Sequence, residues 1–320
     1  MPTDVRPPYD AELEAALAVI QEQMPATITP EMISAMRAAP VTAPIEEVLE
    51  GRNISHREVR IPGYEGADIT LSIFARNDHD AAGPGIYHTH GGGMIIGDRF
   101  TGIEVPLEWV ERFDAVCVSV EYRLAPEFPD PYLVEDCYAG LVWTAGHAGE
   151  LGIDPSHLII GGGSAGGGLA AGTTLLARDR QGPRLSGQVL IYPMLDDRNQ
   201  TVSANQFAGI GVWDRGSNQT GWAACLGERC GTDDVSIYAA PARATDLSGL
   251  PPTFIDVASA EVFRDEAVAY ASQIWADGGV AELHVWPGGF QGFDLFAPHA
   301  QIAQAAIRTR TDWVARHLSA

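Results

Sequence analysis

The 320-residue sequence contains no lysine, so its 20 cationic side chains are all arginine. The absence of lysine excludes Schiff-base chemistry and a serine–lysine dyad. With 42 acidic residues the formal net charge is −22, and so acidic a surface repels the phosphates of nucleic acids and of anionic lipids. We therefore expect neither a nucleic-acid partner nor a membrane partner.

Cysteine is scarce as well. The four cysteines are too few for a disulfide framework, and none has a partner at metal-binding spacing. Cys225 and Cys230 could bridge locally, but we favour two reduced thiols. The first thirty residues lack the apolar segment of a signal peptide, and no run approaches roughly eighteen apolar residues. We expect a cytoplasmic protein without metal or other cofactor.

The apolar pattern indicates the architecture. Short apolar runs alternate with helical periods, which is typical of a mainly parallel sheet covered on both faces by helices. We expect an α/β catalytic domain from residues 51–198 and 232–320, in which residues 59–74 form an antiparallel hairpin at a sheet edge. Residues 1–50 read as helices, and residues 199–231, rich in Asn, Gln, Gly and Trp, interrupt the alternation. These two segments are the predicted N-terminal cap helices and cap insertion. The closing helix is predicted from about residue 297 to 318.

The most informative stretch is LIIGGGSAGGGLAAG, in which an apolar strand runs into Gly162, Ser164 and Gly166 and then into a helix. This is a G-x-S-x-G nucleophile elbow in the strand–turn–helix setting that it requires. Small neighbours let strand and helix approach closely, so that the hydroxyl is exposed. The pattern predicts Ser164 as a catalytic nucleophile.

A second motif, HTHGGGM, follows an earlier strand candidate. Consecutive glycines let backbone N–H groups point into a site, where they can donate to an oxyanion together with the residue after the nucleophile. The predicted donors are Gly92, Gly93 and Ala165. We interpret His90 as a residue that organises the loop, and His88 as a packing or pocket residue.

The motifs HGGG, VEYRLAPE, GGSAGG and FRDEAVAYA resemble those of the hormone-sensitive-lipase-like branch (bacterial family IV) of the α/β-hydrolases, whose members are mostly carboxylesterases. The resemblance runs from about residue 80 to the C-terminus. It implies an α/β-hydrolase fold, a helical lid over an acyl pocket, and a small-molecule ester with a short acyl chain as substrate.

The family pattern places a catalytic aspartate before the sequence Pro-Leu-Arg-Asp-Glu, and here Glu261 occupies that position in EVFRDE. Glutamate can hold an imidazole as aspartate does, and the hydrolase fold accepts either. Asp256 and Asp265 lie nearby in sequence. We interpret Asp265 as a helix-start or arginine-paired carboxylate.

The family's general-base histidine follows a Pro-Gly pair and precedes Gly-Phe, and here Gln291 occupies that position. An amide has no basic lone pair that accepts a proton near neutral pH, so Ser164 would remain a poor nucleophile. His299, which we expect in the closing helix, would need a rearranged loop to reach the serine. Glu261 acting directly as the base would have to bridge the space of an imidazole.

Three functions remain open at this point: a carboxylesterase disabled by replacement of its histidine, a ligand-binding protein on a hydrolase scaffold, and non-hydrolytic elimination or isomerisation through an enolate. We favour the first, because the nucleophile and the oxyanion donors are intact. Residues that could line the pocket, as alternatives to structural packing, are Phe207, Trp213, Trp222, Phe290 and Phe293. An exposed edge strand at AELHVW would allow a homodimer by sheet extension.

Overall fold

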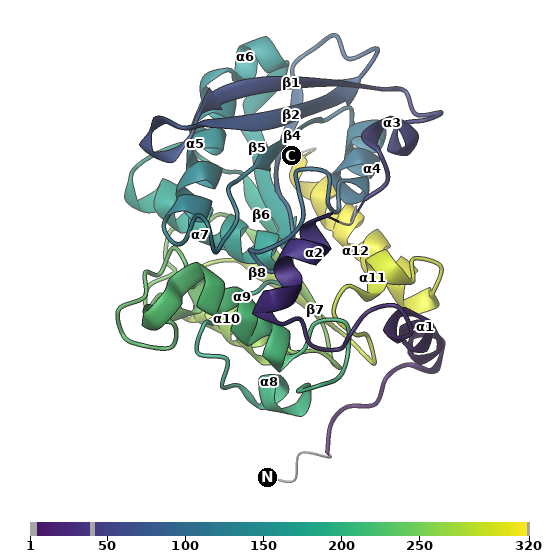
Figure 1. Cartoon of the computed structure of the whole chain (residues 1–320). Coiled ribbons are helices and arrows are strands. Elements are labelled where there is room, and N and C mark those ends of the chain that lie inside the picture. Colours follow the sequence, from purple (N-terminus) through teal and green to yellow (C-terminus); the bar gives the residue numbers. More distant parts are fainter. Residues whose placement is uncertain (1–4, 39–41, 319–320) are drawn as a thin grey trace.

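The computed structural model describes residues 5–38 and 42–318 and contains an eight-stranded sheet in the order β1-β2-β4-β3-β5-β6-β7-β8 (Figure 1). Strand β2 is antiparallel to both of its neighbours, and the other paired strands are parallel. The predicted α/β class and the edge hairpin are confirmed. The strands are β1 (Ile54–Pro62), β2 (Asp68–Arg76), β3 (Gly83–Thr89), β4 (Val116–Glu121), β5 (Ile153–Gly163), β6 (Gly187–Ile191), β7 (Thr253–Ala258) and β8 (Ala281–Trp286).

Helices cover both faces of the sheet (Figure 1). Helices α4 and α12 contact each other on one face, while α5 and α7 contact each other on the opposite face. The α-helices are α1 (Ala11–Gln21), α2 (Ile33–Ala38), α3 (Ile45–Val48), α4 (Glu104–Phe113), α5 (Tyr132–Gly146), α6 (Ala148–Leu151), α7 (Ala165–Asp179), α8 (Val202–Gln206), α9 (Arg215–Leu226), α10 (Arg264–Ala276), α11 (Phe293–Phe296) and α12 (Gln301–Leu318). Short 3-10 helices are η1 (Pro30–Met32), η2 (Tyr64–Gly66), η3 (Gly227–Arg229) and η4 (Pro241–Arg243).

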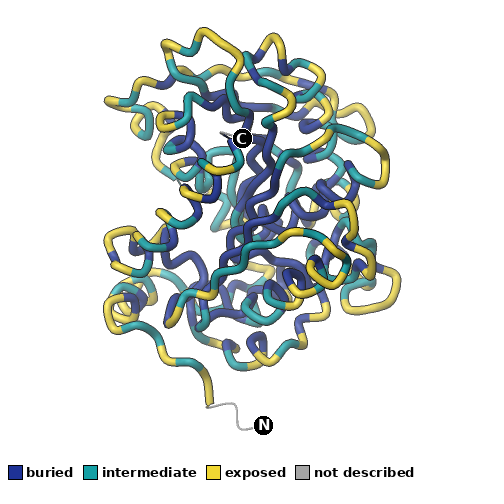
Figure 2. The backbone as a smooth tube through the Cα atoms, turned by 180° about the vertical axis from the view of Figure 1, so that it is seen from behind, coloured by how far each residue is buried: buried dark blue, intermediate teal, exposed yellow. Residues whose placement is uncertain are grey.

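The core lies along the middle strands, where Figure 2 shows the buried backbone gathered in the centre of the molecule. Every residue of β6 and β7 is buried. Strands covered on both faces carry continuous apolar runs rather than an alternating pattern. The apolar runs of these two segments therefore predict buried strands. None of the helices in the described ranges has the length and apolar composition needed to span a bilayer.

The N-terminal segment and the segment of residues 199–231 are bonded to each other. The Thr27 hydroxyl donates to Asp214 Oδ2 at 2.9 Å, and the Ile28 N–H donates to Ser217 Oγ at 2.8 Å. These contacts support the predicted cap. Of the predicted segments, residues 1–4, 39–41 and 319–320 lie outside the described residues.

The closing helix differs from the prediction at its start. Helix α12 begins at Gln301, after the separate short helix α11 and a turn that contains Pro298. Proline lacks a backbone N–H and pushes the preceding residue out of helical conformation, and Ala297 accordingly has φ −135°. His299 is therefore an exposed residue of this turn, and its predicted place in the helix was wrong.

Candidate active site

Ser164 occupies the sharp turn between β5 and α7. Its backbone has φ 59° and ψ −123°, a conformation that costs a non-glycine residue roughly 1–3 kcal/mol. The turn is held on both sides: the Ser164 N–H donates to the Ile191 carbonyl at 2.9 Å, and the Ser164 carbonyl accepts from the Met194 N–H at 3.0 Å. The residue is only partly buried. Backbone strain and access are the features that a nucleophile elbow provides.

Two glycines make this turn possible. A Cβ on Gly162 would lie 2.4 Å from the carbonyl oxygen of Thr89, and one on Gly166 would lie 2.1 Å from the same atom. Strand β3, which ends at Thr89, therefore approaches the elbow closely enough to exclude any side chain at either position. The glycine-rich sequence around the serine follows from this contact.

The loop after β3 lies beside the nucleophile. A Cβ on Gly91 would lie 3.6 Å from the Ser164 Cβ. Gly92 and Gly93 have φ 113° and 61°, and within the described part of the chain no group accepts a hydrogen bond from their N–H groups. Ala165 begins α7, where the first N–H groups have no partner in the helix. Free donors from the loop and from the helix start are what an oxyanion hole requires.

His90 fixes this loop through contacts with Gly91 and Tyr122. Its Nδ1 lies 2.8 Å from the Gly91 carbonyl, and its ring stacks on Tyr122 with 4.0 Å between centroids. Burial lowers the pKa of His90 to about 4 and that of His88, whose Nε2 lies 3.4 Å from the Thr101 carbonyl, also to about 4. Both rings are neutral near pH 7. The contacts support the predicted loop-organising role of His90.

Residue 291 follows β8 in a loop that packs on the loop after β7. The Gly289 carbonyl accepts from the Ala260 N–H at 3.1 Å, and the Gly288 N–H donates to Ser259 Oγ at 2.8 Å. Gln291 itself is 9% exposed. Its amide makes no hydrogen bond with a described residue, Ser164 included. Because β5, β7 and β8 are parallel, the segments that follow them meet at one edge of the sheet.

Glu261 lies in the loop after β7 and is 2% exposed. Its Oε1 accepts the Ala258 N–H at 2.9 Å, whereas Oε2 is buried without a partner among the described residues. Burial raises the pKa of Glu261 well above its usual value, and the negative charges of Asp256 and Asp294 add to this. The carboxyl thus keeps its proton at pH values where a free glutamate is ionised.

A model of the alpha/beta hydrolase fold matches residues 86–295, which carry the elbow, the glycine loop and the Glu261 and Gln291 positions. The chain belongs to this hydrolase family. It is 34% identical to carboxylesterase NlhH of Mycobacterium tuberculosis over 299 residues, or 92% of each protein. Among solved structures, bacterial heroin esterase superimposes with a TM-score of 0.88 at 37% identity, covering 97% of this chain and 98% of that one. Esterase LipW from Mycobacterium marinum gives 0.84 at 28% identity, with 98% of each chain covered.

These relatives confirm the resemblance to the hormone-sensitive-lipase-like branch that the motifs indicated. The hydrolase has the serine-hydrolase scaffold of carboxylesterases. What each residue of the site does in this chain remains a prediction that stands on the geometry above.

Asp265 of the hydrolase joins α10 to the segment of residues 199–231, the predicted cap insertion. Its Oδ2 accepts the Ser203 N–H of α8 at 2.7 Å, and its Oδ1 accepts from Arg264 Nε at 2.8 Å. This is the arginine-paired carboxylate that the sequence predicted, at the start of α10. Its neighbour in the motif, Glu266, accepts the Leu195 N–H at 2.7 Å.

The predicted pocket aromatics lie in different surroundings. Phe290 and Phe293 are fully buried in an apolar cluster with helix α1, and the ring of Phe207 lies against the N-terminal segment. Trp213 covers the glycine loop after β3 so closely that a Cβ on Gly93 would lie 2.0 Å from its ring. A pocket role for these residues, as for His88, remains a prediction.

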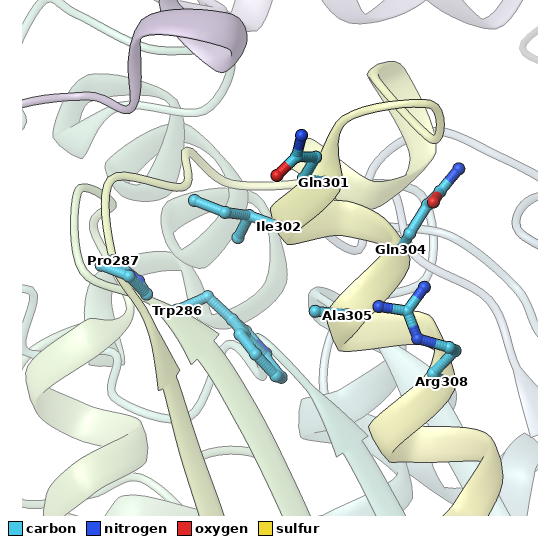
Figure 3. A pocket seen from close by; sticks show the side chains of 7 residues that line it. All are labelled: Trp286, Pro287, Gln301, Ile302, Gln304, Ala305 and Arg308. Atoms are coloured by element: carbon cyan, nitrogen blue, oxygen red, sulfur yellow. The ribbon is translucent and has the colours of Figure 1, made fainter.

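Ser164 lines neither of two cavities in the described surface of the hydrolase. The larger, of about 560 Å³, lies between the end of β8 and α12, with Trp286 and Arg308 on opposite sides (Figure 3). The smaller, of about 450 Å³, lies between α2, α9 and the loop at Pro126. The larger cavity adjoins the base of the loop that carries Gln291, because Trp286 and Pro287 line it.

Sequence reasoning missed a buried arginine next to the site. Arg310 is 1% exposed and pairs with Asp256 and Asp294. A signal was present: Arg310 falls at helical spacing between Ala306 and Trp313, on the buried face of α12. A charged residue on an apolar face indicates a buried ion pair, but the sequence did not reveal its partners.

Proposed function

We propose that this hydrolase is a carboxylesterase for small esters with short acyl chains, and that Gln291 at the general-base position impairs its turnover. The observation that carries the proposal is the strained elbow at Ser164 beside the unpaired N–H groups of Gly92 and Gly93. Such donors have no structural use in the described fold, whereas they fit the oxyanion of a tetrahedral intermediate.

The chemistry follows from these positions. Ser164 Oγ attacks the acyl carbonyl, and the charge that develops on the carbonyl oxygen is received by the N–H groups of Gly92, Gly93 and Ala165. The serine proton must leave as the bond forms, and afterwards a proton must reach the departing alcohol. An imidazole held by Glu261 would carry both transfers, but the Gln291 amide accepts no proton near neutral pH. Loss of one triad member leaves about 10³–10⁴-fold catalysis over water.

A second candidate is binding, or lyase or isomerase chemistry, without a serine nucleophile. The observation in its favour is that burial raises the pKa of Glu261 well above its usual value, while the Gln291 amide carries no charge. A carboxyl group whose burial favours the protonated form needs no imidazolium beside it. In that case the oxyanion donors would hold a ligand carbonyl or an enolate.

The experiment compares hydrolysis of p-nitrophenyl acetate and p-nitrophenyl butyrate by the unchanged chain and by Gln291→His. We expect the variant to gain about 10⁴–10⁶-fold in turnover, the cost of a missing triad residue. If both proteins are inert, the non-hydrolytic candidate leads. Equal activity in both would mean that another group acts as the base.

We further propose that the hydrolase forms a homodimer through β8. This strand is at the edge of the sheet; Val285 within it is 41% exposed, and Val280, directly before it, is 64% exposed. An unpaired edge with apolar side chains is a template for strand pairing. Light scattering should give twice the 34.2 kDa chain mass, and Val285→Lys should return it to the monomer value.

We also propose a cytoplasmic location. Cys117, Cys137, Cys225 and Cys230 are all free thiols. Reduced cysteines fit a compartment in which thiols are kept reduced. Fractionation of cells that produce the protein tests this, and recovery from the medium or from the membrane fraction would contradict it.

A further inference from the structure

Arg310 lies at the centre of a buried ionic cluster beside the loop that carries residue 291. Its Nη2 donates to Asp256 Oδ2 and to Asp294 Oδ2, each at 2.9 Å. The three side chains come from α12, β7 and α11, and none is more than 3% exposed. We call Arg310, Asp256 and Asp294 the Arg310 cluster.

The cluster holds the loop at both ends. Trp286, directly before the loop, donates from Nε1 to Asp256 Oδ2 at 3.4 Å, and Asp294 follows Gln291 by three residues. Both ends of the loop are therefore bonded to the Arg310 cluster. Because Asp256 belongs to β7, the cluster also fixes the loop to the strand that precedes Glu261.

A contribution to the stability of the fold does not readily explain the Arg310 cluster. Arg310 Nε and Nη1, Asp256 Oδ1 and Asp294 Oδ1 are all buried without a hydrogen-bond partner within the described part of the chain. Buried ion pairs with unsatisfied atoms are often no more stable than apolar residues of the same volume. The two carboxylates and the guanidinium are therefore better explained by the position that they give to the neighbouring loop than by a gain in the free energy of unfolding.

We propose that Arg310 is a positioning residue of the active site, which fixes the loop of residue 291 by bridging Asp256 and Asp294. It acts through the loop and touches no reacting atom. The inference rests on the proposed esterase function, because only a base at position 291 makes the loop geometry catalytic. A misplacement of about 1 Å in a catalytic group can cost about 10²-fold in rate.

The activity test is made in the Gln291→His background with Arg310→Met, Arg310→Lys and Asp294→Ala. Arg316→Met is the matched control, since Arg316 lies on the same helix and pairs with Glu282 at the surface at 2.6 Å. We expect Arg310→Met and Asp294→Ala to lower kcat about 10–100-fold with KM changed less than about threefold. Lysine should recover part of the loss, and Arg316→Met should lose nothing. Unchanged kcat in the first two variants, or a loss confined to KM, would overturn the proposal.

A second measurement separates this proposal from the proposed function. Hydrogen exchange of the unchanged Gln291 chain is compared with that of Arg310→Met and Asp294→Ala, which needs no activity. We expect faster exchange of amides at residues 287–297 and unchanged exchange at residues 89–95. Equal rates in the loop, or faster exchange everywhere, would overturn the positioning role even if Gln291→His proves active. If Arg310→Met does not fold, Asp294→Ala decides alone, because it leaves Arg310 paired one to one with Asp256.

Discussion

The Ala258 N–H donates to Oε1 of Glu261 at 2.9 Å, and the other oxygen of that carboxyl group has no partner within the described ranges. The position of Glu261, the proposed triad acid, is therefore fixed by the backbone at the end of β7. Among the described residues no imidazole lies within hydrogen-bond distance of Oε2. The hydrolase thus holds the proposed acid in place, while Gln291 stands at the position predicted for the base.

The protonation of Glu261 makes stability depend on pH. Burial raises the pKa of Glu261 in the folded state above its pKa in the unfolded state. The contribution of Glu261 to the free energy of unfolding is therefore fully present below the ordinary glutamate pKa, and it is lost as pH rises through the folded-state pKa. Glu261→Gln, which keeps the acceptor for Ala258, should therefore raise Tm at pH 8 by about 1–2 °C, the effect of ~1 kcal/mol in a protein of this size. The gain should shrink toward pH 4.5. Thermal denaturation across this range, with the exposed Glu47→Gln as control, checks the prediction; a gain independent of pH would contradict it.

Two adjacent glycines provide a matched test of the elbow. A Cβ at Gly162 would lie 2.4 Å from the Thr89 carbonyl, whereas one at Gly163 would be in ordinary contact, 3.4 Å from the Tyr192 ring. Gly162→Ala should destabilise by at least about 2 kcal/mol, because backbone must move. Gly163→Ala should change stability by less than about 1 kcal/mol. Urea denaturation of both variants measures the difference, and equal losses would mean that the elbow is less tightly packed than described.

His90 makes the hydrolase sensitive to acid. The Gly91 carbonyl is an acceptor, so Nδ1 carries the hydrogen, and Nε2 is buried without a partner in the described part of the chain. Burial lowers the pKa of His90 to about 4 from the ordinary value of 6.5, so the stability it contributes is present above pH 6.5 and is lost as pH falls toward 4. The loss is on the order of 3 kcal/mol.

His90→Asn tests this relation, since the asparagine amide can still donate to the Gly91 carbonyl but does not titrate. The variant should be less stable than the parent at pH 8, because the ring stacked on Tyr122 is lost. It should lose less stability than the parent between pH 6.5 and pH 4.5. Denaturant midpoints at several pH values measure both effects. If the midpoints of the two proteins fall equally with decreasing pH, another group causes the acid sensitivity.

Ser164 and Arg310 show most clearly what can and what cannot be predicted from the sequence. The elbow and the glycine loop could be predicted because their chemistry depends on local sequence: a strand, a tight turn that only glycine permits, and a helix. The Arg310 cluster joins residues 54 positions apart in the sequence, and no local sequence pattern predicts which residues pair over such a separation. Phe290 and Phe293 illustrate the same limit, since helix α1, from the other end of the chain, buries them.

The central claim is that Ser164 and its oxyanion donors are intact and that only the base is missing. The most direct test is kcat/KM for p-nitrophenyl acetate at pH 8, measured for Gln291→His and for Gln291→His with Ser164→Ala. We predict a gain of about 10⁴-fold or more in the first protein and its complete loss in the second. Activity that persists after removal of Ser164, or no gain on introduction of the histidine, would contradict the claim.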